Sequence, residues 1–201
     1  MSSEQKGVVV YCASSSNIAP EFFEAGRQVG RLLASAGVPV ISGGGSAGLM
    51  AAVIEGAVEA GGQAIGVLPG FMIEKGWDHP LLTRRIVTET MHERKKLMAD
   101  MSRAAIALPG GVGTLDELFE IITWRQLRIY NGNVVICNIA GFYDLLFRHL
   151  QYTAEAGFMR REAPDRLWFI ADSAKKAVEL ALSPATDPGV QYQMPDRKTV
   201  S

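Results

Sequence analysis

The chain has 201 residues, of which 48% are hydrophobic, so it can bury one sizeable core without disulfides or metals. Its 20 basic and 21 acidic residues nearly cancel, which excludes the basic excess typical of nucleic-acid-binding proteins. No apolar run approaches the roughly 20 residues of a membrane-spanning helix, and the short polar start does not resemble a secretion signal. We therefore expect a cytoplasmic protein that binds neither nucleic acid nor membranes.

The two cysteines, Cys12 and Cys137, each lie in a short apolar run. Such positions are typical of buried free thiols in a reducing compartment. No group of cysteines and histidines has the spacing of a metal site. We expect no disulfide, no bound metal and no cofactor.

Short apolar runs alternate with segments of helical spacing along almost the whole chain. Residues 8–12 predict a first buried strand, and residues 20–36, whose apolar side chains fall on one face, predict a helix that Gly37 ends. The other predicted strands are residues 38–41, 63–68, 85–88, 104–108, 134–138 and 167–170. The other predicted helices are residues 48–60, 91–102, 114–127, 143–156 and 173–182, and residues 71–83 are expected to be irregular.

This alternation predicts an α/β fold. Short, continuously apolar strands that are separated by helices indicate a doubly wound, mainly parallel sheet with helices on both faces. Residues 1–183 are expected to form a single domain, and the proline-containing segment 184–201 a loose C-terminal tail. In such sheets ligands bind at the carboxyl ends of the strands, where the strand order reverses.

Glycine- or serine-rich turns follow three of the predicted strands, at residues 13–16, 43–46 and 109–114. A turn without bulky side chains exposes backbone N–H groups at a helix N-terminus, which suits an anion. Three such turns at one sheet edge predict a phosphate-sized pocket, although a tight turn alone explains the second equally well. Neither the Walker A pattern nor the dinucleotide-binding fingerprint is present.

Charged residues accompany the third turn. Glu117 follows Thr114 at the spacing of a capping box, and this spacing alone favours a structural role with Thr114 as the N-cap. Arg94 and Lys95 fall at the start of the preceding predicted helix, where a solvated basic face is the simplest interpretation. Basic groups there oppose the helix dipole, which hints at a compensating anion.

Two motifs together are recognisable: Met-His-Glu-Arg-Lys at residues 91–95 and Pro-Gly-Gly-Val-Gly-Thr-Leu-Asp-Glu at residues 109–117. They resemble the Lonely Guy (LOG) family of cytokinin riboside 5′-monophosphate phosphoribohydrolases, which are often labelled lysine decarboxylases. The resemblance extends over residues 8–182. It implies a Rossmann-like fold, a homodimer or higher oligomer, and release of free base and ribose 5-phosphate from a cytokinin nucleotide or AMP.

The resemblance implies that Arg94 and Glu117 are catalytic, so Glu117 is expected to do more than cap a helix. Glu74 is included among the binding positions because many members have a glutamate where this chain has Gly76. Trp77 is expected either to line a pocket for an apolar N6 substituent or to pack in an interface or core. The turns and the resemblance together predict substrate binding by Ser14, Gly44, Gly45, Glu74, Lys95, Gly110, Gly111, Val112, Gly113, Thr114, Leu115 and Asp116.

Two other functions are alternatives to hydrolysis. A non-catalytic carrier of a nucleotide or of molybdenum cofactor would keep the glycine-rich turns but give Arg94 and Glu117 no special role. Lysine decarboxylation needs pyridoxal phosphate on a lysine, and Lys95 and Lys96 lie on a charged segment without an evident ring-binding context. The preferred hypothesis is hydrolysis through an oxocarbenium-like ribosyl centre that Glu117 stabilises.

Overall fold

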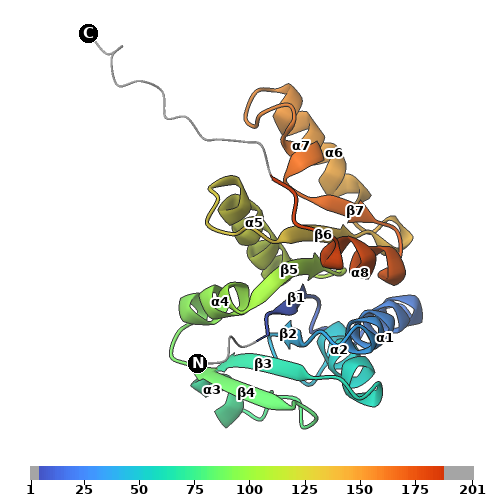
Figure 1. The fold of residues 1–201 in the computed structure, drawn as a ribbon, viewed down its shortest axis with the longest axis vertical. Coiled ribbons are helices and arrows are strands. Elements are labelled where there is room, and N and C mark those ends of the chain that lie inside the picture. The colour runs from blue at the N-terminus through green and yellow to red at the C-terminus, as the bar shows by residue number, and fades with distance from the viewer. Residues whose placement is uncertain (1–4, 188–201) are drawn as a thin grey trace.

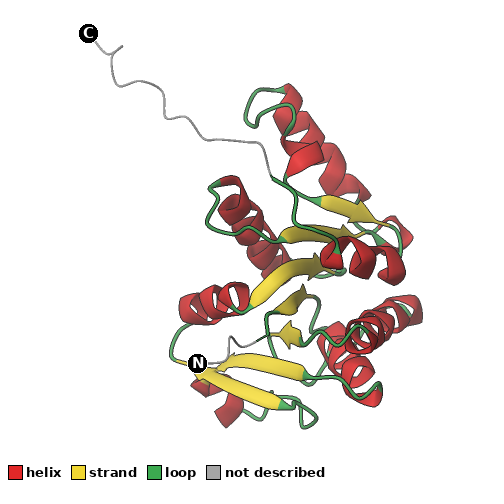
Figure 2. Ribbon diagram, viewed as in Figure 1, coloured by secondary structure: helices red, strands yellow, loops and turns green. Residues whose placement is uncertain are grey.

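The computed structural model describes residues 5–187 and shows a seven-stranded, entirely parallel sheet with helices on both faces (Figures 1 and 2). The strand order is β4-β3-β2-β1-β5-β6-β7, so the direction of winding reverses between β1 and β5. The predicted doubly wound α/β fold is confirmed. The strands are β1 (Gly7–Tyr11), β2 (Val40–Ser42), β3 (Ala64–Pro69), β4 (Arg84–Thr88), β5 (Ser102–Ala107), β6 (Asn133–Cys137) and β7 (Phe169–Ala171).

Two layers of helices enclose the sheet. Helices α1, α2 and α8 share one hydrophobic core with it, and α4, α5 and α6 share the other (Figure 1). The helices are α1 (Pro20–Ser35), α2 (Gly48–Glu59), α3 (Gly70–Glu74), α4 (Met91–Asp100), α5 (Val112–Gln126), η1 (Ile139–Gly141), α6 (Asp144–Glu155), α7 (Ala163–Arg166) and α8 (Ala174–Leu182).

The alternation of side chains in β1 shows why its sequence is apolar throughout. Val8 and Val10 pack into the core beneath α1 and α2, whereas Val9 and Tyr11 pack into the core beneath α4 and α5. All four are buried. A strand that is covered on both faces has no position for a polar side chain, which accounts for the continuous apolar run.

The segment predicted to be irregular contains a short helix. Residues 70–74 form α3 directly after β3, and the chain leaves it at Gly76, whose φ of 68° lies in the left-handed region. Glycine adopts this conformation without steric cost and commonly ends helices. The expectation of irregular structure was wrong for residues 71–74, because a glycine such as Gly76 can also mark the end of a helix.

Helix α5 begins at Val112, so the predicted capping box at Thr114 and Glu117 is wrong. Gly111 occupies the N-cap position with extended backbone, and no side chain caps the helix there. Thr114 is already in the first turn and is buried against Gly110, where an added Cβ would lie 2.1 Å from its Oγ1. Because helical geometry starts at Val112, Glu117 is free of the capping role.

Other boundaries of the predicted elements differ by at most two residues. Helix α4 ends at Asp100 and β5 begins at Ser102, whereas the prediction extended the helix through residue 102. The short elements η1 and α7 were not predicted. Cys12 and Cys137 are buried free thiols, as expected. In the described part of the chain, no helix combines the length and the apolarity that a membrane span requires.

The first part of the predicted tail is held against the domain. The backbone N–H of Thr186 donates to Asn133 Oδ1 at 3.2 Å, and Arg125 Nη2 donates to the Thr186 carbonyl at 3.0 Å. Residues 188–201, the rest of that predicted segment, lie outside the described residues.

Candidate active site

A cavity of about 640 Å³ opens at the carboxyl ends of the strands, where the strand order reverses. Its wall includes residues 12–15 after β1, residues 45–47 after β2 and residues 111–114 at the start of α5. Switch points of doubly wound sheets are the usual place for a ligand, because the connections on either side diverge there. The sheet therefore brings together the three turns that the sequence singles out.

Backbone contacts hold the turns against one another. The N–H of Ala13 donates to the Pro109 carbonyl at 3.1 Å, and the Ala13 carbonyl accepts from the N–H of Met50 at 3.2 Å. Gly48 has a φ of 63°, and an added Cβ would lie 2.5 Å from the backbone of Ser14. The close approach of the first and second turns therefore requires glycine at position 48.

The loop after α3 closes over the second turn. Ser46 N–H donates to the Trp77 carbonyl at 2.9 Å, and His79 N–H donates to the Gly44 carbonyl at 2.8 Å. These bonds hold the backbone of Trp77 beside the second turn, and Trp77 lines the cavity. The large apolar side chains of the wall are those of Met50, Leu68, Met72, Trp77 and Val112.

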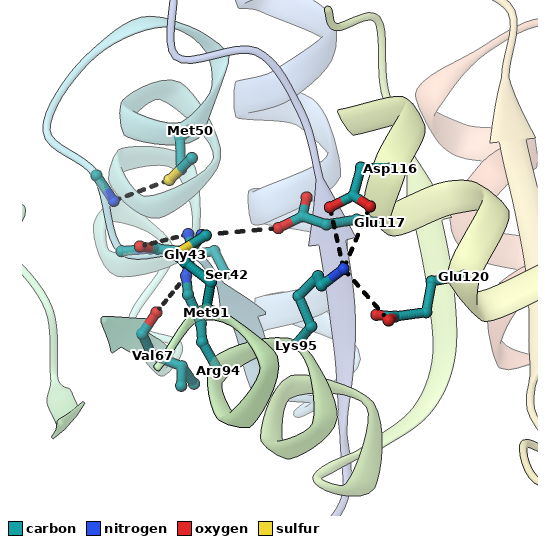
Figure 3. A network of polar contacts seen from close by, with 12 residues as sticks. Ser42, Gly43, Met50, Val67, Met91, Arg94, Lys95, Asp116, Glu117 and Glu120 are labelled. Atoms are coloured by element: carbon teal, nitrogen blue, oxygen red, sulfur yellow. Dashed lines mark hydrogen bonds and ion pairs between the residues drawn. The ribbon is translucent and has the colours of Figure 1, made fainter. Parts of the chain in front are cut away.

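Arg94 comes from the first turn of α4 and is buried, with 6% of its surface exposed. Its Nε donates to the Val67 carbonyl at 2.9 Å, and its Nη2 donates to the Gly43 carbonyl at 3.2 Å (Figure 3). An added Cβ at Gly43 would lie 1.9 Å from Nη2, so glycine is needed there. Nη1 remains directed at Glu117, 3.9 Å from Oε1.

Glu117 lies one turn beyond the start of α5, and its side chain is 13% exposed. Burial raises the pKa of its carboxyl from 4.5 to about 7. Arg94 and Lys95 lower this pKa, whereas Asp116 and Glu120 raise it. Near neutral pH the group therefore exists in both ionisation states, which is typical of carboxyls that take part in catalysis.

Lys95 forms ion pairs with two carboxylates of α5. Its Nζ lies 3.0 Å from Asp116 Oδ2 and 3.2 Å from Glu120 Oε1, and its side chain is 12% exposed (Figure 3). Burial acts to lower the pKa of Lys95, but the hydrogen bonds to Asp116 and Glu120 prevail and raise it. Lys95 is therefore a cation at neutral pH.

The structure divides the predicted site residues into two groups. The cavity is lined by Ser14, Gly45, Arg94, Gly111, Val112, Gly113, Thr114 and Glu117. The residues outside its lining are Gly44, Glu74, Lys95, Gly110, Leu115 and Asp116.

Two of the residues outside the lining have other surroundings. Glu74 is exposed on α3, and Gly44 packs its backbone against Leu68. Prediction from the sequence missed Met50 and Leu68 as lining residues. An apolar side chain at the end of a strand or in the first turn of a helix gives no sign in the sequence that it lines a cavity. The strand order must be known first.

The arrangement combines three chemical features around one space. Residues 111–114 at the N-terminus of α5 line the cavity, and the first N–H groups of a helix, which have no acceptor within the helix, suit an anion. Glu117 and Arg94 place a carboxylate and a guanidinium in its wall. Cys12 also lines the cavity, but burial raises its pKa far above the ordinary range and keeps it a thiol.

Comparison with known proteins gives consistent matches. Residues 50–181 match the family described as "Possible lysine decarboxylase". One cytokinin riboside 5′-monophosphate phosphoribohydrolase of Arabidopsis thaliana is 35% identical over 87% of this chain and 76% of its own length. A second one from the same plant is 36% identical over 86% of this chain and 79% of its own length. A probable enzyme of the same name from Oryza sativa subsp. japonica is 39% identical over 152 residues, and the match spans 62% of its length.

Solved structures share the fold. The molybdenum cofactor binding protein of Rippkaea orientalis aligns with a TM-score of 0.68 and 24% identity, over 89% of this chain and 96% of that one. The molybdenum cofactor carrier protein of Chlamydomonas reinhardtii aligns with a TM-score of 0.67 and 23% identity, over 88% and 95%. At this level of identity the likeness concerns the fold alone.

Proposed function

This chain belongs to the family described as "Possible lysine decarboxylase", which its similarity to the plant phosphoribohydrolases supports, and from that premise we propose that it hydrolyses a nucleoside 5′-monophosphate. The products are the free base and ribose 5-phosphate. The observation that supports this most directly is the cavity wall in which Arg94 and Glu117 face each other beside the N-terminus of α5.

Glu117 supplies the negative charge that the reaction needs. Cleavage of the bond between ribose and base develops positive charge on the sugar, as in glycoside hydrolysis. A carboxylate beside the sugar stabilises that charge and orients the attacking water. Arg94, held by the carbonyls of Val67 and Gly43, favours the ionised form of Glu117 and binds substrate oxygens.

The N-terminus of α5 binds the 5′-phosphate in this proposal. Backbone N–H groups of residues 111–114 are the donors, and the helix dipole adds to their attraction for an anion. The phosphate then orients the ribose beside Glu117, so binding energy remote from the bond contributes to its cleavage.

The apolar side of the cavity accommodates the base. Met50, Met72 and Trp77 form a surface that suits a purine and an apolar substituent on its N6 atom. We therefore propose that cytokinin nucleotides, which have such a substituent, are accepted together with AMP. No lysine is found among the described residues that line the cavity, so none there is placed to form a Schiff base of the kind that lysine decarboxylation uses.

Incubation with AMP and with N6-isopentenyl-AMP, followed by chromatography, should show release of the free base. Adenosine is the matched control, because it lacks only the phosphate. We expect its kcat/KM to be lower by about 10²-fold or more, since the anchoring at α5 is lost. Equal rates with adenosine and AMP would contradict the phosphate site. Binding of both nucleotides without any base release would contradict hydrolysis and favour a carrier.

Gly113→Ala should weaken AMP binding without weakening the fold. The Cβ of alanine would meet no atom within 4 Å, and alanine in a helix is favoured over glycine by about 0.5–1 kcal/mol. The methyl group occupies space at the proposed phosphate site, so we expect KM for AMP to rise about tenfold. Calorimetry and steady-state kinetics measure the two effects.

The matched control is Gly70→Ala at the start of α3. Its Cβ would have an equally open environment, with Val87 Cγ1 at 3.9 Å as the closest contact, but Gly70 does not line the cavity. Its KM should not change. An unaltered KM in Gly113→Ala would remove residues 111–114 from the phosphate site.

A further inference from the structure

Lys95 connects the two helices that supply the catalytic pair. It follows Arg94 on α4, and its partner Asp116 precedes Glu117 on α5. The ion pair between Lys95 and Asp116 therefore lies beside the contact between Arg94 and Glu117, and both join the same two helices (Figure 3). Glu120, one turn further along α5, accepts from the same ammonium group.

We propose that Lys95 is a positioning residue for the hydrolysis. Its ion pairs with Asp116 and Glu120 hold α5 against α4, so that Glu117 stays beside Arg94, and its charge offsets the two carboxylates that flank Glu117. The inference rests on the proposed function. It differs from the role in substrate binding that the family resemblance implies for this position.

The contacts of Lys95 argue against a direct bond to the substrate phosphate. Its Nζ already lies within 3.2 Å of three carboxylate oxygens, and the residue is outside the cavity lining. Moving it into the cavity would leave Asp116 and Glu120 without their cation, next to a third carboxyl. The side chains of Lys95 and Glu120 are 12% and 26% exposed, so little solvent would replace the contact that is lost between them.

Several groups surround Glu117 and set its charge. Arg94 and Lys95 face it from α4, and Asp116 and Glu120 flank it on α5. Tyr11 at the end of β1 and Cys12 directly after it also act on Glu117, and burial raises the pKa of both groups and keeps them neutral. Without the Lys95 charge, the negative charges of Asp116 and Glu120 are opposed only by Arg94. Protonation of Glu117 then becomes easier.

The experiment compares four variants by two measurements. The pH dependence of kcat/KM for AMP gives the acid limb, and ¹³C NMR of labelled glutamate gives the titration of Glu117 directly. Lys95→Met should move both upward by about one pH unit. Lys95→Arg, which keeps the charge, should restore the wild-type values. Glu120→Gln should move them downward, and Lys96→Met, whose pair with Asp100 is exposed, should not move them.

These measurements separate the positioning role from substrate contact. If Lys95→Met raises KM for AMP at every pH and leaves the titration of Glu117 in place, Lys95 binds the substrate and the proposal is overturned. Should that variant not fold, Glu120→Gln decides the matter, because an unshifted titration overturns the proposal as well. The NMR titration needs no turnover, so it also tests Lys95 in the event that no nucleotide is hydrolysed.

Discussion

Replacing Glu117 by glutamine should lower kcat for AMP by about 10³-fold while the Kd for AMP changes little. Glutamine has the shape of glutamate, so the cavity and the site at the start of α5 are kept. The charge that stabilises the ribosyl cation is lost, and removal of one such preorganised group typically costs 10²–10³-fold in rate. The proposed mechanism needs the ionised carboxyl, so wild-type kcat should rise with pH through the Glu117 pKa of about 7.

Single-turnover kinetics and calorimetric titration with AMP measure the two quantities. Glu179→Gln on α8 is the matched control, since its side chain is 53% exposed and outside the cavity. It should behave as wild type in both assays. Turnover by Glu117→Gln at close to the wild-type rate would show that this carboxyl does not act on the substrate.

The same substitution should stabilise the fold above neutral pH. Burial raises the pKa of Glu117 from 4.5 to about 7, so the unfolded chain releases this proton earlier than the folded one. Folding stability therefore falls as the pH rises from 4.5 to 7, and the full penalty remains above 7. Glutamine removes it, with a gain on the order of 2 kcal/mol at pH 8 that vanishes below pH 4.5. Urea unfolding at both pH values measures this difference.

Arg94→Met should abolish activity and also destabilise the protein in a pH-dependent way. The carbonyls of Val67 and Gly43 lose their buried donor, and Glu117 loses its nearest cation. Breaking a buried ion pair on one side costs about 3–5 kcal/mol when the remaining group is charged. We expect such a loss at pH 8 and a smaller one at pH 5, where Glu117 is protonated and needs no counter-charge.

The control for this prediction is a second buried arginine. Arg125 is fully buried and donates to the carbonyls of Gly132 and Thr186, at the other end of α5 from the cavity. Arg125→Met should lose similar stability at pH 8 and pH 5, because the groups that accept from Arg125 are two backbone carbonyls and a hydroxyl, which do not titrate in this range. An equal loss at both pH values in Arg94→Met would show that its pairing with Glu117 contributes nothing.

The strand and helix pattern could be predicted from the sequence because most strands of this sheet are buried on both faces. A continuous apolar run such as residues 8–12 then predicts a strand that is buried on both faces. The start of α5 could not be predicted in the same way. Thr114 and Glu117 have the spacing of a capping box, and only the extended backbone at Gly111 shows that the helix has already begun.

Parts of the site also needed the fold. Arg94 and Glu117 were paired through the family resemblance, since nothing local to either residue relates α4 to α5. Trp77 could not be placed, because backbone bonds between distant turns put it in the wall. The partners of Lys95 had a visible signal: Asp116 and Glu120 are four residues apart on one helix and therefore share a face.

All described residues that line the cavity lie between positions 12 and 117. Strands β6 and β7 and helices α6 to α8 contribute none, although α8 and β6 share the core beneath α1. The residues that form the cavity wall and those that only pack against its elements are thus separated along the chain. Substitutions on the outer surface of residues 118–187 are expected to leave the cavity wall unchanged.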